Sequence, residues 1–105
     1  MSGLGEMGNL LKQAQEMQRQ LDAVRGELRT RAIEGMAAGG LVRVTLSADR
    51  HEVLGVHLAP GAPADPRALE ESIASALRDA LRRATEAERE AIGRITGGMN
   101  LPGLL

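Results

Sequence analysis

The sequence predicts an α+β fold of one domain, residues 1–105, in the order long N-terminal helix, three-stranded antiparallel meander, long C-terminal helix (α-β-β-β-α). Three observations support this prediction. Apolar residues recur with a helical period over roughly residues 4–30, they alternate with a period of two over 41–46 and 53–58, and a second helical stripe follows Pro66. Each change of period along the chain indicates a change of secondary structure.

The first helix is predicted from a heptad seam of apolar residues. Its members are separated by alternating steps of four and three residues and are Leu10, Ala14, Met17, Leu21, Val24 and Leu28. A seam with this period packs against a partner helix. The partner is either the second helix of the same chain or the equivalent helix of another subunit. We expect residues 1–8 to be a flexible N-terminus.

Two strands are predicted from alternation. Val42, Val44 and Leu46 face one way in residues 41–46, and we expect Leu54, Val56 and Leu58 to face inward in residues 53–58. The short polar stretch 48–51 is predicted to be a hairpin loop. Residues 31–37, with Ile33 as the best apolar anchor, form a weaker first strand.

The glycines of residues 35–40 have two interpretations, a phosphate-binding loop and a hairpin turn. A phosphate-binding loop of the Walker type carries Gly-x4-Gly-Lys-Ser/Thr between a strand and a helix. Here Gly39 and Gly40 are followed by Leu41 and Val42, without a lysine and ahead of a strand. Glycine also supplies the positive φ that a hairpin turn needs. The sequence therefore favours a turn.

The second helix has a strong start signal, with Asp65 as N-cap and Pro66 at the first helical position. It carries a broad apolar stripe: Leu69, Ile73, Leu77, Ala80, Leu81, Ala84, Ala91, Ile92 and Ile95. We expect the helix to run to about residue 95, with Gly93, Gly97 and Gly98 closing it. Residues 97–105 are expected to form an apolar tail.

Composition restricts the possible functions. The chain has no Phe, Trp or Tyr, so its core must be thin, and association with a second copy is favoured. It has no cysteine, which excludes a thiol nucleophile and a thiolate metal site. The N-terminus lacks the features of a signal peptide and no apolar run is long enough to span a bilayer, so we expect a cytoplasmic protein without a membrane partner.

We find no catalytic residue and no metal or cofactor site in the sequence. The only two histidines, His51 and His57, would lie roughly 20 Å apart along an extended chain, too far to share an ion. No serine lies in a nucleophile elbow, and the acidic pairs are typical of solvated helix faces. We therefore expect the protein not to be an enzyme, to need no cofactor and to have no small-molecule substrate.

Arginine placement is the most informative feature, because the net charge is only −1 and any binding of a polyanion must depend on where the charges lie. Four arginines of the second helix fall within an arc of about 60° opposite the apolar stripe: Arg67, Arg78, Arg82 and Arg89. On the first helix Lys12 and Arg19 lie opposite the seam, and Arg25, Arg29 and Arg31 gather near its end. Arginines and lysines placed in this way could contact DNA phosphates. The alternative is that they only form a solvated helix face.

The whole chain also resembles a known family. Four stretches, in order and spacing, are similar to the YbaB/EbfC family of bacterial nucleoid-associated DNA-binding proteins: LLKQAQEMQRQLDAVRGEL, GGLVRVTLSADRHEVLGVHLAP, DPRALEESIASALRDALRRATE and ITGGMNLPGLL. The resemblance covers about nine tenths of the sequence. The chain departs from the family in having less lysine, and in having Arg50 and His51 in the hairpin loop, where relatives often carry Asn, Gly or Lys.

The resemblance implies a tweezer-like homodimer that binds double-stranded DNA and alters its conformation, with consequences for nucleoid organisation and gene regulation. It implies that the two helices supply the DNA contacts. On this chain the corresponding DNA-binding residues are Lys12, Arg19, Arg78, Arg82, Arg83 and Arg89. The lack of aromatic residues argues against base stacking, so the partner is expected to be a duplex held by its phosphates.

A second hypothesis is a homodimeric protein-interaction scaffold. In this alternative the heptad seam of the first helix and the apolar C-terminal tail recruit another protein, and the arginines only solvate the surface.

Overall fold

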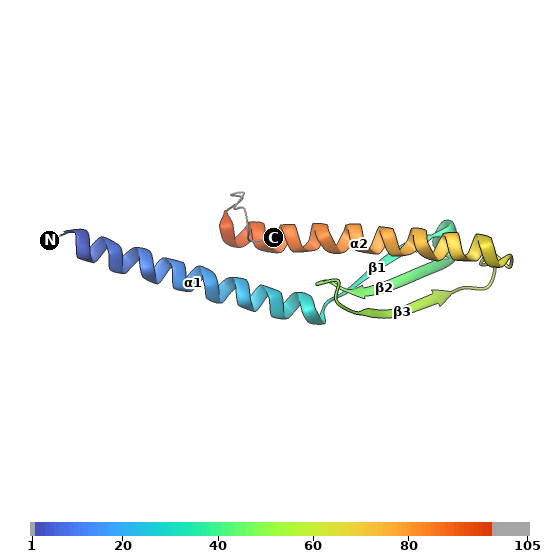
Figure 1. The fold of residues 1–105 in the computed structure, drawn as a ribbon, viewed down its shortest axis with the longest axis horizontal. Coiled ribbons are helices and arrows are strands. Elements are labelled where there is room, and N and C mark those ends of the chain that lie inside the picture. The colour runs from blue at the N-terminus through green and yellow to red at the C-terminus, as the bar shows by residue number, and fades with distance from the viewer. Residues whose placement is uncertain (1, 98–105) are drawn as a thin grey trace.

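The computed structural model describes residues 2–97 and confirms the predicted order of elements (Figure 1). Helix α1 spans Ser2–Thr30 and helix α2 spans Pro66–Thr96. Between them lie strands β1 (Ala32–Ala37), β2 (Val42–Ser47) and β3 (Val53–Leu58), with a single 3-10 turn η1 (Ala38–Gly40) joining the first two. The α+β class is therefore correct. The flexibility expected for residues 1–8 stays a prediction, and residues 98–105 of the apolar tail lie outside the described residues.

The molecule is strongly elongated. Its principal extents are 74 × 21 × 16 Å, and its radius of gyration is 19.7 Å. A compact domain of this length would have a radius of gyration of about 13 Å. Figure 1 shows the reason: the sheet and the first half of α2 form one end, the second half of α2 lies beside α1, and α1 then continues beyond the end of α2. One end of the protein is thus a lone helix.

The three strands form an antiparallel sheet in the order β1-β2-β3. Helix α2 packs on β1 and β2 and buries one face of the central strand, where Val42, Val44 and Leu46 are exposed by 2% or less. The alternation predicted for β2 is therefore confirmed.

The inward side predicted for Val56 and Leu58 is correct, but β3 is not buried in this single chain, and the prediction for Leu54 is wrong. Val56 and Leu58 pair with Val44 and Val42, so they face the side of the sheet on which α2 lies, yet they are 50% and 44% exposed because α2 covers only the other two strands. Leu54 is out of register: an irregularity at Thr45/Leu46 pairs Val53 with Leu46, and Leu54 is 49% exposed. The edge strand thus presents an uncovered apolar surface.

Small residues bring α2 very close to the sheet. Its buried positions are mainly alanines, namely Ala76, Ala80, Ala84 and Ala87, together with Ile92 and Thr96. Ala76 and Ala80 lie over Gly35 of β1, where a Cβ would overlap backbone atoms of both alanines. The predicted stripe was therefore partly misplaced: Ala76 and Ala87 belong to the buried face, and Leu81 is 38% exposed.

The heptad seam of α1 has a partner only in its C-terminal half. Leu21 and Leu28 are 3% exposed and Val24 packs against the core cluster that contains Ala84 and Ala87 of α2. Leu10 is 64% exposed, and Figure 1 shows that the N-terminal part of α1 continues past the end of α2. Of the two partners that the sequence left open, the second helix of the same chain occupies half of the seam.

The turns and caps follow the sequence signals closely. The Asp65 carboxylate accepts the backbone N–H of Ala68 at 3.0 Å, and Gly97 ends α2 in the left-handed region at φ 65°. Gly39 and Gly40 have φ of 67° and 88° between β1 and β2, which is the turn conformation expected there. Gly93 lies inside α2, so the prediction that it helps to close the helix is wrong.

Candidate nucleic-acid interface

The outward face of α2 presents the arginines that the sequence singled out. Arg78, Arg82 and Arg89 are exposed, and helical geometry places them roughly opposite the buried alanines. Arg67, in the first turn, lies on the same face and is also exposed. From Arg78 to Arg89 the row extends over about 16 Å of helix, since each residue adds about 1.5 Å. We call these four residues the α2 ridge.

Arg82 and Arg83 are tied to a single carboxylate. Asp79 accepts hydrogen bonds from Arg82 Nη2 at 2.7 Å and from Arg83 Nε at 3.0 Å, and it also accepts the backbone N–H of Met36 in β1 at 3.0 Å. Arg82 makes a second ion pair with Glu86 at 3.2 Å. Arg83 points to the β1 side of the helix, so it does not belong to the α2 ridge.

These contacts strongly favour the ionised form of Asp79. The hydrogen bond from the Met36 N–H, followed by those from the two guanidinium groups, lowers the pKa of Asp79 to about 2 from its ordinary value of 3.8. The carboxylate therefore remains charged at neutral pH and offsets part of the charge of both arginines.

The cations of α1 lie apart from this ridge. Lys12 is exposed on α1, and Arg19 is exposed and ion-paired with Glu16 on the same helix. The structure thus brings Arg78, Arg82 and Arg89 together on one face, with Arg83 beside them, and leaves Lys12 and Arg19 on a separate arm.

Neither helix carries a surplus of positive charge. Within its bounds α2 has six arginines and six acids, and α1 has three arginines, one lysine and four acids. An anion would therefore be attracted only where cations lie free of carboxylates. Within residues 2–97, Arg67, Arg78 and Arg89 make no ion pair, and Arg78 and Arg89 lie in the part of the ridge that also carries Arg82, which makes these two the strongest phosphate-contact candidates.

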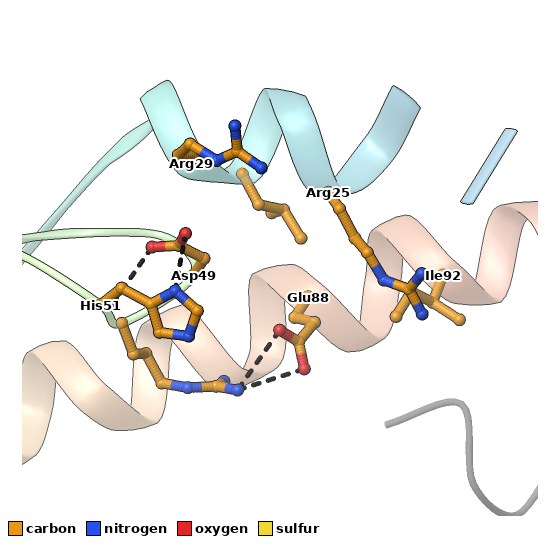
Figure 2. Close-up of a pocket in the computed structure, with 8 residues that line it drawn as sticks. Arg25, Arg29, Asp49, His51, Glu88 and Ile92 are labelled. Atoms are coloured by element: carbon orange, nitrogen blue, oxygen red, sulfur yellow. Dashed lines mark hydrogen bonds and ion pairs between the residues drawn. The ribbon is translucent and has the colours of Figure 1, made fainter. Parts of the chain in front are cut away.

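A second group of cations lies at a pocket that was not predicted from the sequence. Arg25 and Arg29 of α1 meet the β2–β3 turn and α2 around a pocket of about 330 Å³ (Figure 2). The turn contributes Asp49, Arg50 and His51, and α2 contributes Glu88. The gathering of arginines near the end of the first helix was visible in the sequence. The signal was incomplete because nothing local places the hairpin loop beside that helix.

Metal binding and membrane insertion find no support in the part of the chain that the structure describes. Residues 2–97 contain no group of three His, Cys, Asp or Glu side chains arranged to hold a metal ion. None of the helices in this range combines the length and the apolar character needed to cross a bilayer.

Comparison with known proteins identifies the family. Residues 3–99 match the YbaB/EbfC DNA-binding family, which is nearly the full chain. This chain belongs to the YbaB/EbfC family. A nucleoid-associated protein of Alkaliphilus metalliredigens (strain QYMF) is 35% identical over 106 residues, covering 99% of this chain and 92% of that protein. The YbaB/EbfC family is a DNA-binding family and not an enzyme family, as expected from the sequence.

A solved structure has the same fold. The crystal structure of the uncharacterized protein HP0035 from Helicobacter pylori superposes with a TM-score of 0.69, covering 89% of this chain and 96% of that one, at 18% sequence identity. At that identity the likeness concerns the fold alone. The YbaB/EbfC assignment rests on the sequence match, and the fold agrees with it.

Proposed function

We propose that this YbaB/EbfC protein is a homodimer that binds double-stranded DNA through phosphate contacts and alters its conformation in the bacterial nucleoid. The observation that carries this proposal is the α2 ridge in a member of a DNA-binding family. Arg78 and Arg89 are exposed and make no ion pair within residues 2–97, so their guanidinium forks are available to phosphate oxygens.

Phosphate contact suits this surface better than base readout. The chain has no aromatic side chain of Phe, Trp or Tyr on which a base could stack, and most of its exposed cations are arginines on the two long helices. Contacts of this kind position a duplex without reading its sequence. The protein would organise or bend DNA and would need no cofactor to do so. Gene regulation would follow from the altered DNA conformation.

A dimer is supported by the uncovered apolar edge of the sheet. Val53, Val56 and Leu58 of β3 are between 44% and 59% exposed and continue the apolar face that α2 covers on β1 and β2. Edge strands with apolar side chains are normally protected from water and from other chains. A second copy would cover this surface and would place two α2 ridges on one particle, which could then contact DNA at two places.

A cytoplasmic location, at the nucleoid, belongs to the same proposal. It is supported by the relative named as a nucleoid-associated protein and by the DNA-binding family itself.

Salt-dependent DNA binding tests the phosphate mechanism. Fluorescence anisotropy of a labelled duplex would be measured between about 50 mM and 200 mM salt, where each phosphate contact contributes roughly one unit to the slope of log affinity against log salt. The variant Arg78→Glu/Arg89→Glu should weaken binding at least about tenfold at low salt and make the slope shallower. The matched control is Arg31→Glu/Arg94→Glu, which changes the net charge equally on residues outside the ridge.

Two results would contradict the proposal. If both double variants weaken binding equally, only overall charge matters and the ridge is not the interface. If neither salt nor the ridge variant changes the affinity, the phosphate mechanism is wrong.

A protein-interaction scaffold is the second candidate, and one observation favours it. Met7, Leu10 and Leu11 are 61% to 67% exposed on the lone end of α1. Such a cluster is typical of a surface that binds another helix. The variant Leu10→Ser/Leu11→Ser would separate the candidates, because a scaffold would lose its protein partners in a pull-down while a DNA-binding protein would keep its affinity for the duplex.

A further inference from the structure

The pocket between α1, α2 and the β2–β3 turn has the construction of an anion site (Figure 2). We propose that it binds a phosphate group, held by Arg25 and Arg29 at a place distinct from the α2 ridge. Arg25 and Arg29 project from successive turns of α1, while Asp49, His51 and Glu88 lie across the pocket on the turn and on α2. At about 330 Å³ the space is ample for a phosphate group and part of what it is attached to.

One side of the pocket is fixed by Arg50. Its guanidinium donates to Thr85 Oγ1 at 3.0 Å and to both carboxylate oxygens of Glu88 at 3.2 and 3.3 Å. Its backbone has φ of 66°, a left-handed conformation that is unfavourable for a residue with a Cβ. The turn keeps this conformation while the side chain anchors it to α2. The wall of the pocket is therefore held in place before any ligand arrives.

The two acids of the pocket already have partners. Glu88 is paired with Arg50, and Asp49 accepts the Ser47 hydroxyl at 2.6 Å and the His51 backbone N–H at 3.1 Å. The hydrogen bond from Ser47, followed by that from the His51 N–H, lowers the pKa of Asp49. Asp49 thus remains a carboxylate whose negative charge is spread over donors of its own turn.

The two arginines of α1 lack comparable partners. Within residues 2–97 Arg25 makes a single ion pair, with Asp22 at 3.6 Å, and this largely exposed pair is worth little. Arg29 makes no ion pair or side-chain hydrogen bond within residues 2–97. The charges of Arg50 and Glu88 cancel, so the charges of Arg25 and Arg29 are balanced only by that of Asp49 among the residues that line the pocket. The charged side chains that line the pocket therefore have one positive charge in excess.

The remaining walls strengthen the attraction for an anion. Leu28 and Ile92 line the pocket and are 3% and 7% exposed, so they bound it with apolar protein rather than water. Low-dielectric walls focus the field of nearby charges into a cleft. Two guanidinium forks match the oxygens of a phosphate, and the lack of aromatic residues leaves nothing for a base to stack on. The ligand is accordingly recognised by its phosphate and not by a base.

Histidine NMR tests the site on the whole chain. The protein has only two histidines, and the variant His57→Gln assigns the ring signals of His51 at the rim of the pocket. Inorganic phosphate would be titrated to tens of millimolar, with sodium chloride of matched ionic strength as the reference. We expect a saturable shift of the His51 signals with phosphate only.

Arg25→Ala/Arg29→Ala should weaken this binding about tenfold or more, because charge-assisted hydrogen bonds are lost. Arg31→Ala/Arg94→Ala should retain it.

These two double variants also separate the sources of the phosphate. If Arg25→Ala/Arg29→Ala weakens duplex binding and Arg31→Ala/Arg94→Ala does not, the ligand is a DNA backbone phosphate. If duplex affinity is the same in both while the phosphate shift is lost in the first, the ligand is a free or nucleotide phosphate. Both results keep the site. Because the changed side chains are exposed and alanine favours helix, the variants should remain folded, which circular dichroism checks.

The site is overturned if phosphate produces no saturable shift of His51, or if Arg25→Ala/Arg29→Ala shows the same shift as the unchanged chain. That failure differs from failure of the proposed function. The phosphate titration contains no DNA, so the site can stand while DNA binding fails, and DNA can bind through the α2 ridge while the pocket takes no phosphate.

Discussion

Gly35 of β1 and Ala80 of α2 lie in backbone contact. A Cβ at position 35 would stand 2.7 Å from the Ala80 Cα, and closer still to the Ala80 nitrogen and the Ala76 carbonyl oxygen. Only glycine permits this approach, and the row of buried alanines on α2 requires it, because short side chains reach the sheet only when the helix lies close. The packing of α2 thus depends on both residue types together.

Replacing Gly35 by alanine should strongly destabilise the fold. The added methyl group meets backbone on α2, which cannot move aside like a side chain, so we expect a loss of about 1–3 kcal/mol or more in the free energy of unfolding. Gly55→Ala is the matched control, because Gly55 lies in the same sheet with open space around it. Urea unfolding followed by circular dichroism checks both variants. Equal stability of the two variants would contradict the contact.

Asp79 should make stability depend on pH in the acid range. Its pKa of about 2 in the folded chain lies below the ordinary value of 3.8. A depressed carboxyl pKa gives stability that is fully present above the unfolded value and is lost as the pH falls from about 4 toward about 2. Asp79→Asn should therefore be less stable than the unchanged chain at neutral pH and approach it near pH 2. Urea midpoints that stay equally far apart over this range would contradict the assignment. Some acid sensitivity should persist in the variant, because the pKa of Asp49 is lowered too.

The same substitution should strengthen DNA binding. Asp79→Asn removes the carboxylate that pairs with Arg82 and Arg83, so both guanidinium groups become available to phosphates. We expect several-fold higher affinity for a duplex and a steeper salt dependence. Glu52→Gln removes one negative charge without an ion pair to any arginine within residues 2–97, and it serves as the control in anisotropy titrations. If the two variants bind DNA alike, the gain reflects net charge only.

Arg50 offers a test of backbone strain against side-chain anchoring. Arg50→Ala loses the contacts with Thr85 and Glu88 and keeps an unfavourable φ of 66°, whereas Arg50→Gly loses the same contacts and relieves the strain. Both variants should be less stable than the unchanged chain. The alanine variant should be lower than the glycine variant by about 1 kcal/mol. Urea unfolding of the three proteins gives the order, and an alanine variant as stable as the glycine variant would show that φ is not strained.

Local signals predicted most of the fold. Asp65 and Pro66 define the start of α2 through chemistry confined to one helical turn, and the alternation of Val42, Val44 and Leu46 requires only that one face of β2 be covered. The same alternation wrongly predicted that β3 would be buried. Which strands a helix covers depends on where it crosses the sheet, and that is set by the contact between Gly35 and Ala80, which joins residues 45 positions apart.

The candidate sites divide in the same way. The α2 ridge could be predicted because helical periodicity fixes which arginines share a face. The role of Asp79 could not be predicted, since its bond to the Met36 N–H joins distant segments. The pocket of Arg25 and Arg29 was hidden for the same reason, because the β2–β3 turn reaches α1 only through the folded sheet.

The exposed face of β3 should be the surface through which two copies associate. Val56→Asp places a charge on the side of β3 that continues the buried face of β2, and burial of that charge in a dimer is unfavourable. We expect dimerisation to weaken by about 2 kcal/mol or more, on the order of thirtyfold, as at the centre of an interface. His57→Asp is the control, because His57 pairs with Arg43 on the opposite face of the same strand. Sedimentation velocity would show the Val56 variant as a monomer at concentrations where the control remains a dimer. Dissociation of both variants alike would place the contact elsewhere on the edge strand, and a dimeric Val56 variant would remove the apolar face of β3 from the interface.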